Sequence, residues 1–245
     1  MTPPPAVELR TRAAPDLHAE APRIGIVVPV LNEAAILPTT LTKLRELAWD
    51  CPVVVADGGS SDGSVEIARQ FFHVERCPVA GRGPQMNRGA RCHDADVLLF
   101  LHADSELPTG WQAHIRHALA DPRVAGGCFR LEFDVPRPML RFYSWFTRFP
   151  GRFFHFGDQG FFVRREIFWR LGGFREVPFL EDVDFLRRLR RYGEFAVLPA
   201  AVRTSARRFL RHGTVRQQLR NIALVVLFEL GASPAQLARL YPHSR

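Results

Sequence analysis

Two carboxylates of this chain come directly after apolar runs that are typical of buried strands. Asp104 ends the segment Phe100-Leu101-His102-Ala103-Asp104, and Asp57 follows the apolar run 53–56. In an open α/β sheet, ligands bind at the carboxyl ends of the parallel strands. Carboxylate oxygens at that edge are suited to a divalent cation and, through it, to a phosphorylated ligand. The pattern therefore predicts a metal-assisted phosphate site at the strand ends.

A regular alternation of apolar runs and helical periodicity begins at Arg23. The runs predict strands, and apolar residues at helical spacing predict the helices that follow them. Such alternation favours right-handed βαβ units and a mostly parallel sheet in an α/β fold. The predicted strands are 24–30, 53–56, 72–76 and 97–101, and the predicted helices are 37–47, 65–71, 85–91 and 111–119.

The pattern changes after residue 119. Residues 128–135 alternate apolar and polar side chains, which predicts a strand with one solvent-exposed face. The last two predicted helices each have a Thr or Ser cap signal, and Pro234 stands in the first turn of the second. The remaining predicted elements are a strand over 160–163 and helices over 140–149, 166–171, 182–192, 214–230 and 234–240.

The chain is basic and rich in arginine. Its 245 residues contain 33 Lys and Arg against 25 Asp and Glu, a formal charge of +8, and Lys43 is the only lysine. Arginine makes bidentate contacts with phosphate and also binds anionic lipid surfaces. A GC-rich genome would produce the same bias, so both explanations stay open. The hydrophobic content of 47% is enough for one large α/β domain with a C-terminal appendage.

Residues 1–22 are rich in Pro and Ala and lack the apolar core of a secretory signal, so we expect a disordered leader. The apolar run 222–230 is far too short to span a bilayer. Four cysteines, at positions 51, 77, 92 and 128, show neither paired metal-ligand spacing nor a dense disulfide pattern. Reduced and mostly buried cysteines suit the cytoplasm. We expect a cytoplasmic protein, with peripheral contact at the inner face of the membrane as a further option.

The loop after the first predicted strand carries Asn32 and Glu33, three residues beyond Pro29. These side chains would lie beside a nucleotide base or ribose; in the alternative, Asn32 caps the helix that follows. A dinucleotide site would instead show Gly-x-Gly-x-x-Gly at this point. Its absence from the sequence argues against a nicotinamide-dependent oxidoreductase.

The loop after the second predicted strand reads Asp-Gly-Gly-Ser-Ser-Asp-Gly from Asp57. Gly58 lets backbone approach a ligand closely, and Asp57 can accept hydrogen bonds from a base or ribose. The alternative is a tight βα loop that Ser61 or Asp62 caps. We expect Asp62 to be structural and Asp57 to contact the ligand.

These two loops together resemble those of the family 2 glycosyltransferases, which begin with Pro-x-x-Asn-Glu and continue with Asp-Gly-x-Ser-x-Asp-Gly. Both segments are present here in order and at comparable spacing, and the resemblance covers most of residues 23–210. It implies a GT-A fold, a Rossmann-like and mostly parallel central sheet flanked by helices, over residues 23–213. Residues 214–245 would then form a C-terminal helical appendage.

The resemblance also implies roles for individual residues on the donor side. The loop beside the nucleotide is matched by Pro29, Asn32 and Glu33. The contact to the base is matched by Asp57 and Gly58, and the segment that closes over the nucleoside is matched by Arg82 and Asn87.

The segment His102-Ala103-Asp104 matches the Asp-x-Asp metal motif of the family in its last position. His102 stands where the first aspartate is usual, which puts the contact to the ribose in doubt. The metal is reached through the last position, so Asp104 remains the expected ligand for Mn or Mg. His102 could also be a histidine at the edge of the core, and beside Asp104 we favour a role that faces the ligand.

Acidic residues at the start of the predicted helix 182–192 match the general base of the family. Asp182 is the candidate base and Glu181 its neighbour, although acidic residues in a first turn also favour the helix dipole. Asp158 and Gln159 come just before the strand that should flank the acceptor pocket. We expect these two side chains to hold acceptor hydroxyls.

The segment 203–213 is unusually basic for a connector. In one interpretation it is a solvated loop. In the other, Arg207 or Arg208 closes over the donor diphosphate as a mobile lid and balances charge on the leaving group. This segment and the His-Ala-Asp variant resemble a small bacterial subgroup of the family.

The sequence thus favours a glycosyltransferase that uses a nucleotide-diphospho-sugar and a divalent cation in a single inverting displacement. The family resemblance alone implies uridine diphosphate as the first choice of nucleotide. The acceptor is open. A lipid-phosphate acceptor fits if the stretches 140–152 and 221–230 lie on a membrane, whereas core packing explains their apolar residues equally well. A nucleotidyltransferase would show a Gly-rich basic loop after the first strand. This sequence has no such loop, which argues against that class. A nucleic-acid-binding module would not explain carboxylates at two strand ends, and we expect no nucleic-acid partner.

Overall fold

The computed structural model describes residues 21–237 except 80, 150, 152–154, 156, 179 and 235. The proposed leader lies outside the described residues apart from residues 21 and 22. Most of the proposed helix 234–240 lies outside them as well.

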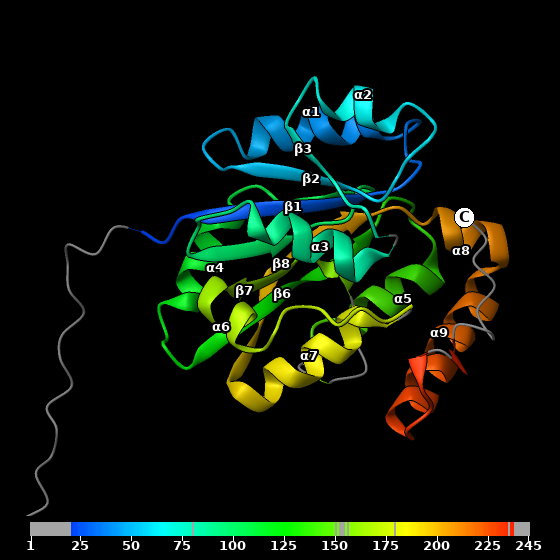
Figure 1. Ribbon diagram of the computed structural model, residues 1–245. Coiled ribbons are helices and arrows are strands. Elements are labelled where there is room, and N and C mark those ends of the chain that lie inside the picture. The colour runs from blue at the N-terminus through cyan, green and yellow to red at the C-terminus, as the bar shows by residue number, and fades with distance from the viewer. Residues whose placement is uncertain are drawn as a thin grey trace, which may run out of the picture.

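The described residues form one mixed sheet of eight strands in the order β3-β2-β1-β4-β7-β6-β8-β5 (Figure 1). Its first half, β3-β2-β1-β4, is parallel, as is the pair β6 and β8. β7 runs antiparallel to both of its neighbours, and β5 runs antiparallel to β8. The strands are β1 Ile24–Val30, β2 Val53–Asp57, β3 His73–Arg76, β4 Val97–Phe100, β5 Ser105–Glu106, β6 Val124–Phe133, β7 Phe161–Arg164 and β8 Glu194–Thr204.

Helices cover both faces of this sheet, which is why its strands read as continuous apolar runs. On β1, Ile24, Ile26 and Val28 pack with α1, α2 and α4, whereas Val27 between them packs with α3, α6 and α7 on the other face. The helices are α1 Leu37–Leu47, α2 Ser64–Ala68, α3 Arg82–Arg91, α4 Trp111–Leu119, α5 Pro138–Phe146, α6 Arg165–Arg170, α7 Glu181–Tyr192, α8 Arg207–His212 and α9 Thr214–Glu229, with a 3₁₀ turn at Gly157–Gln159.

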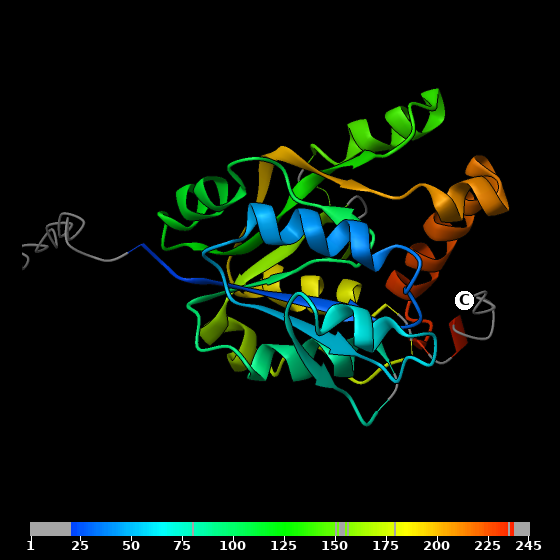
Figure 2. The same cartoon turned by 90° about the horizontal axis from the view of Figure 1, so that it is seen from above.

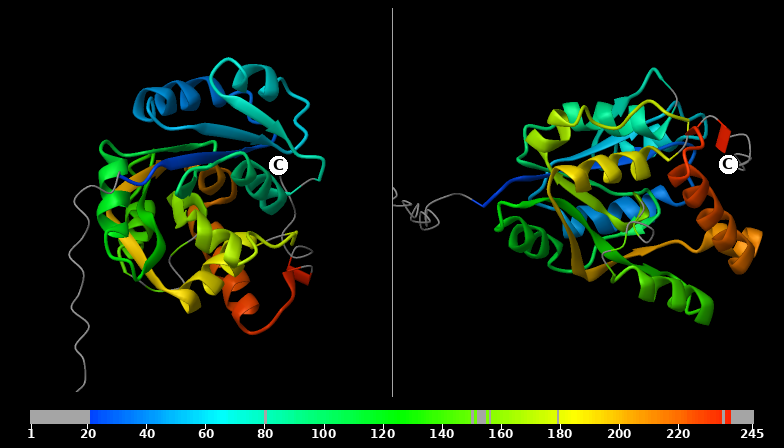
Figure 3. Two further views of the ribbon diagram at one scale, coloured as in Figure 1. Left: turned by 60° about the vertical axis from the view of Figure 1, so that its left-hand side comes forward. Right: turned by 90° about the horizontal axis from the view of Figure 1, so that it is seen from below.

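Three helices lie together at one side of the molecule (Figures 2 and 3). These are α5, α8 and α9, and β1 and β2 run toward them, so the carboxyl edge of the parallel strands faces α8 and α9. Leu224 and Phe228 of α9 are buried against Leu180 and Val183 at the start of α7. In the part of the chain that the structure describes, no helix is long and apolar enough to cross a membrane.

The second half of the chain differs from its sequence pattern. The strand expected at 128–135 begins earlier, at Val124, and most of its residues are buried, because β7 and β8 pair with it on both sides. Within 128–135 the predicted alternation is confirmed, since Leu131 and Phe133 are buried, Arg130 is half-buried, and Glu132 and Asp134 are exposed. Strand β8 was not predicted, since Pro199 interrupts it; the register between β6 and β8 shifts at this point, where a bulge accommodates proline.

The segment 203–213 is not a loop. It contains the end of β8 and the helix α8. Helix α9 begins at Thr214 as expected, but its N-cap residue is Gly213, so Thr214 is the first residue of the helix and not its cap. Ser233 does act as predicted, because its hydroxyl accepts a hydrogen bond from the backbone N–H of Gln236 at 3.3 Å.

Candidate active site

The first two βα loops are joined to each other at the carboxyl ends of β1 and β2. Asn32 has a positive φ of 53°, and its side-chain Oδ1 accepts a hydrogen bond from the Ser61 N–H at 2.9 Å. The Asn32 N–H donates to Ser60 Oγ at 2.9 Å in return. The alternative role as a helix cap is wrong, because the N-cap residue of α1 is Ile36. Asn32 instead fixes the relative position of both loops.

Asp57 is buried at the end of β2, and its carboxylate accepts hydrogen bonds from the N–H groups of Gly59 at 3.0 Å and Ser60 at 3.2 Å. This carboxylate therefore shapes its own loop, in addition to the base contact that we proposed for it. Asp62 is structural as expected, since it accepts hydrogen bonds from the N–H groups of Ala34 at 2.9 Å and Ser64 at 3.0 Å.

Gln85 is a positioning residue that the sequence analysis missed. Its buried side-chain Nε2 donates to the carbonyl oxygens of Val30 at 2.7 Å and Ala56 at 2.9 Å, and so holds the ends of β1 and β2 together. A Cβ atom at Gly58 would lie 2.7 Å from this side chain. Gly58 is therefore needed for the close approach of Gln85.

Three aspartates from different elements interact electrostatically at the strand ends. Asp104 follows β4, Asp158 lies in the 3₁₀ turn and Asp182 lies in the first turn of α7. Burial, and then the charges of Asp182 and Asp104, raise the pKa of Asp158 to about 6. Burial and the nearby Glu33 likewise raise the pKa of Asp104. Burial is the main cause of both raised pKa values, and the neighbouring carboxylates add to it.

Arg82 is one of the cations beside this acidic cluster. Its Nε lies 3.6 Å from Glu181 Oε1, and the Glu181 side chain is almost fully buried. Burial would lower the pKa of Arg82, but Glu181 and Asp182, followed by Asp104 and Asp158, outweigh that effect and raise it. Glu181 therefore holds Arg82 beside the aspartates.

Gly157 marks the point where three elements meet. Its N–H donates a hydrogen bond to Asp182 Oδ2 at 2.7 Å. A Cβ atom at this position would lie 2.9 Å from Asp182 Oδ2 and 3.3 Å from His102 Nε2. His102 and Asp182 therefore lie close to each other, with Gly157 between them.

The surroundings of His102 disfavour its protonated form. Burial, and then the cations Arg82 and Arg208, hold the pKa of His102 well below its usual value. A cavity of about 10 Å³ lies against His102, Asp182 and Gly157, which is room for about one water molecule. This cavity is too small for a sugar ring.

Arg207 and Arg208 stand at the start of α8, close to the acidic residues. Arg207 Nη2 lies 3.0 Å from Glu33 Oε2, and this hydrogen bond is the main cause of the raised pKa of Arg207. Arg208 lowers the pKa of both His102 and Asp158 through its charge. Both arginines thus lie on a helix at the site rather than on a loop.

The segment before α8 is attached to the proposed metal residue. The Ser205 N–H donates to the backbone oxygen of Asp104 at 3.2 Å, and Ser105 Oγ lies 3.0 Å from Thr204 Oγ1. β5 and the end of β8 pair around these contacts. The position of Asp104 therefore depends on β8, which follows it by about one hundred residues in the chain.

Two expected ligand contacts are not supported by the geometry. Asn87 is buried; its Nδ2 donates to the Phe174 oxygen at 2.7 Å and its Oδ1 accepts from the Phe174 N–H at 2.9 Å. Gln159 is also buried, with Oε1 2.9 Å from His155 Nδ1 and 3.3 Å from Cys128 Sγ. Both amides hold neighbouring segments in place, and the ligand contacts that we expected of them stay predictions.

Two further residues of the predicted site, Ala103 and Pro29, belong to the core and to a strand. Ala103 is buried within the core, so its backbone alone can meet a ligand. Pro29 lies within β1, paired with Ala56.

Asp184, the third acidic residue of the first turn of α7, accepts hydrogen bonds from Arg188 at 2.9 Å and Arg175 at 3.2 Å. Asp184 is therefore committed to ion pairs and is not a candidate base.

The residues at the strand ends fit a divalent cation. Among the described residues, Asp158 Oδ1 is a buried carboxylate oxygen without a hydrogen-bond partner. Asp104 and Asp158 both have raised pKa values because the site concentrates negative charge in a poorly solvated place. Oxygen ligands of this kind are those that Mg²⁺ and Mn²⁺ prefer.

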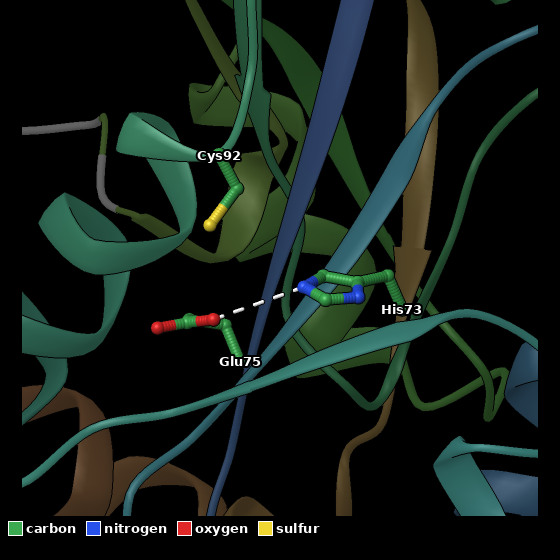
Figure 4. A group of neighbouring side chains, drawn as sticks. All are labelled: His73, Glu75 and Cys92. Atoms are coloured by element: carbon green, nitrogen blue, oxygen red, sulfur yellow. Dashed lines mark ion pairs between the residues drawn. The ribbon is translucent and has the colours of Figure 1, made fainter.

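A second group of potential ligands lies on β3 and at the end of α3 (Figure 4). Ligand atoms of His73, Glu75 and Cys92 lie within 4.8 Å of one another. However, Arg88 Nε lies 2.5 Å from Glu75 Oε1, and burial and Glu75 raise the pKa of the Cys92 thiol. We assign no metal to this group, because a guanidinium already neutralises its carboxylate. All four cysteines are free, with Cys77 and Cys128 buried.

The chain belongs to glycosyl transferase family 2, whose family model matches residues 25–174. A biosynthesis glycosyltransferase for PGL/p-HBAD from Mycobacterium bovis is 37% identical over 95 residues, which are 36% of this chain and 37% of the relative. An undecaprenyl-phosphate 4-deoxy-4-formamido-L-arabinose transferase from Aeromonas hydrophila is 30% identical over 132 residues, or 51% of this chain and 40% of the relative. The chain thus spans less than half of the length of these curated relatives.

Solved structures confirm the predicted fold. The mannosyltransferase PcManGT from Pyrobaculum calidifontis, in complex with GDP-Man and Mn²⁺, superimposes with a TM-score of 0.63 at 21% identity, over 89% of this chain and 67% of that chain. TarS 1–349 from S. aureus, in complex with UDP, gives a TM-score of 0.58 at 15% identity, over 88% of this chain and 68% of that chain. The α/β fold is therefore of the GT-A type, with a mixed rather than a mostly parallel sheet.

Proposed function

We propose that the protein is a glycosyltransferase that moves a sugar from a nucleotide-diphospho-sugar to an acceptor hydroxyl, with a divalent cation, in a single inverting displacement. The observation that carries the proposal is the convergence of Asp104, Asp158 and Asp182 at one edge of the sheet. This edge faces the two loops of the family motif, which hold Asn32 and Asp57.

On the donor side, Asn32, Glu33 and Asp57 would contact the nucleotide. Asp104 would hold Mn²⁺ or Mg²⁺, and this cation supplies charge neutralisation on the diphosphate when bound. We propose Asp158 as the second carboxylate at the cation, in place of the acceptor contact that we expected of it from the sequence. Arg207 and Arg208 carry positive charge on the same side of the site and would stabilise the departing diphosphate. A mannosyltransferase of the same fold is known in complex with GDP-Man and Mn²⁺, which supports this arrangement.

On the acceptor side, Asp182 would take the proton of the attacking hydroxyl. The Gly157 N–H fixes one of its oxygens, and the Val183 N–H donates to the other at 2.8 Å. These two hydrogen bonds orient the carboxylate at the N-terminus of α7. The attacking oxygen would approach the anomeric carbon from the face opposite the diphosphate, which inverts its configuration. Uridine diphosphate remains our working choice of nucleotide, since TarS was solved in complex with UDP, and a relative named as an undecaprenyl-phosphate transferase makes a lipid-phosphate acceptor the first to test.

The test is a thermal-shift screen of UDP- and GDP-sugars with and without Mn²⁺, on the wild type and on Asp104→Ala. A ligand that binds the native state alone raises the melting temperature. We expect a Mn²⁺-dependent shift in the wild type and its loss in Asp104→Ala. The matched control is Asp94→Ala, an exposed aspartate just before β4, at the opposite end of that strand. A shift of the same size and Mn²⁺ dependence in Asp104→Ala would contradict the metal assignment.

A further inference from the structure

The strongly exposed large apolar side chains of the described residues are concentrated on one part of the surface. Eleven of these fourteen side chains lie on α5, α8 and α9 or within three residues of their ends. Exposed apolar side chains that gather on one part of a soluble protein mark an interaction surface. We call the outward faces of these three helices the α5–α9 surface.

On α5 the exposed side chains are aromatic. Phe142 and Trp145 are 55% and 44% exposed, and Phe149 follows just beyond the helix. The opposite face of α5 is already used, because Leu140 and Tyr143 pack with Leu131, Phe133 and Phe209. Trp145 and Phe149 contact edge to face, with ring centroids 4.7 Å apart. The outward aromatic face of α5 therefore takes no part in this packing.

On α9 the exposed side chains form a stripe. Val215, Leu219, Ile222 and Val226 recur at helical spacing, and Leu219 is 62% exposed. The inward face of α9 is again occupied, since Leu224 and Phe228 are buried against the start of α7. The helix is thus apolar on two faces, one packed on the protein and one open. An ordinary surface helix would carry polar residues on the open face.

The charges on these helices are almost all positive, with Glu229 at the end of α9 as the exception. Residues 136–149 contain three arginines and residues 205–228 contain five, and neither stretch contains Asp or Glu. Arg141, Arg148 and Arg216 are exposed, and the Arg148 guanidinium lies 5.3 Å from the ring centroid of Trp145. Anionic bilayers bind surfaces on which aromatic and basic side chains lie side by side. The aromatic rings enter the headgroup region, and the arginines contact the lipid phosphates.

We propose that the α5–α9 surface docks on an anionic lipid bilayer. A second copy of this chain is a poor occupant, because two arginine-rich faces would repel each other. A nucleic acid would not require the apolar stripe. If the proposed function holds, docking also positions the site: α9 packs directly on Leu180, which precedes Glu181 and Asp182 in the chain. The proposed base would then lie close to an acceptor carried in the membrane.

Vesicle flotation of the full chain tests the proposal. We expect the wild type to float with vesicles of phosphatidylglycerol and phosphatidylcholine, and much less with phosphatidylcholine alone. Phe142→Ser with Trp145→Ser should weaken binding at least about tenfold. Arg141→Gln with Arg148→Gln should weaken it about 25-fold, since each basic residue near an anionic surface contributes about fivefold. Leu219→Ser with Ile222→Ser should weaken it as well, which shows that α9 takes part.

Matched controls come from elsewhere on the surface. Trp49→Ser removes an aromatic ring that is 84% exposed at the end of α1, and Arg69→Gln removes an exposed arginine after α2. Both should bind vesicles as the wild type does. The proposal is overturned if the wild type fails to float with anionic vesicles, or if the α5 and α9 variants float equally well. Sedimentation that shows a wild-type dimer dispersed by these variants would instead identify a second copy as the occupant. Melting temperature and nucleotide binding without vesicles report on folding and on the proposed function separately.

Discussion

Arg207 Nη2 lies 3.0 Å from Glu33 Oε2, although 174 residues separate the two in the chain. The ion pair joins the first βα loop to helix α8, and the nearby hydrogen bond from Ser205 to the Asp104 backbone joins the same helix segment to the end of β4. The C-terminal part of the chain therefore completes the edge of the sheet where the donor is expected. Because Arg207 is more than half exposed, we assign this pair a positioning role and no measurable part of the stability.

Replacing Arg207 and Arg208 with Ala should weaken binding of a nucleoside diphosphate. Charge-assisted contacts to phosphate contribute about 1.5–3 kcal/mol, so we expect a loss of about 10- to 150-fold for the pair. Affinity for the free nucleoside, which has no phosphate, should hardly change. Calorimetric titration with both ligands makes the comparison.

The control for this pair is Arg211→Ala, since Arg211 is an exposed arginine on the same helix. It should bind both ligands as the wild type does. Equal losses for nucleoside and nucleoside diphosphate in the double variant would show that the arginines support the fold, and no loss for either ligand would show that they do not contact the donor.

Asp182→Asn should remove turnover and keep donor affinity. The amide preserves the shape of the carboxylate but cannot take the proton of the acceptor, and the loss of a general base costs about 10²- to 10⁴-fold in rate. Initial rates of transfer and donor titrations measure the two effects.

Asp184→Asn is the matched comparison, because Asp184 lies in the same first turn but pairs with Arg175 and Arg188. It should lower the free energy of unfolding by about 1–3 kcal/mol and change the rate by only a few-fold in the folded enzyme. Normal transfer in Asp182→Asn together with inactive, well-folded Asp184→Asn would reverse the two roles.

Asp158 should make the metal-free protein less stable as the pH rises. Its pKa is raised from 3.8 to about 6 in the folded state, by burial first and then by Asp182 and Asp104, so the folded protein holds the proton more tightly than the unfolded chain does. The stability from this group is full below about pH 3.8 and is lost as the pH rises through about 6. Asp158→Asn should therefore be more stable than the wild type above pH 6, by up to about 3 kcal/mol, and equal to it near pH 4.

Urea unfolding of both proteins in EDTA, between pH 4 and pH 8, checks this difference. Parallel stability curves would mean that Asp158 is not held near its charged neighbours in solution. Added Mn²⁺ should reduce the advantage of the variant, because a cation at the site favours the ionised carboxylate.

Asn87→Ala should destabilise the fold rather than remove a ligand contact. The substitution leaves both the N–H and the carbonyl oxygen of buried Phe174 without their side-chain partner, which costs about 1–3 kcal/mol. Thermal unfolding should show the loss, and Gln70→Ala, at an exposed site after α2, should not. An unchanged melting temperature with weakened nucleoside binding would restore the contact that the family resemblance suggested.

Local patterns were sufficient for the first half of the fold. Helices α1 and α4 have the predicted bounds, and β1, β2 and β4 agree to within one residue. The physical reason is that these elements are buried on both faces of a sheet or on one stripe of a helix, so their apolar spacing is visible within the segment itself. The positions of Asp57 and Asp104 after strands follow from the same spacing.

The donor loops could also be predicted from the sequence, because Asn32, Glu33 and Asp57 lie in short motifs close to one another in the chain. The residues that hold these loops in place could not be predicted in the same way. Ser60 and Ser61 bond to Asn32 across the two loops, and Gln85 supports both strands from α3. The sequence placed these residues near the site without indicating which of them shape it and which meet a ligand.

Long-range pairing decided the rest. β7 inserts antiparallel between β4 and β6, and β8 pairs with β6 around Pro199, where local propensity argued against a strand. Whether an amide such as Asn87 or Gln159 binds a ligand or a neighbouring backbone depends on residues that are distant in sequence. Composition, motifs and periodicity determined the family, the fold class and the acidic strand ends, since these depend on neighbours in the chain. Tertiary structure alone decided that Asp104, Asp158 and Asp182 share one poorly solvated site, because the energy of a buried charge depends on what lies around it in space.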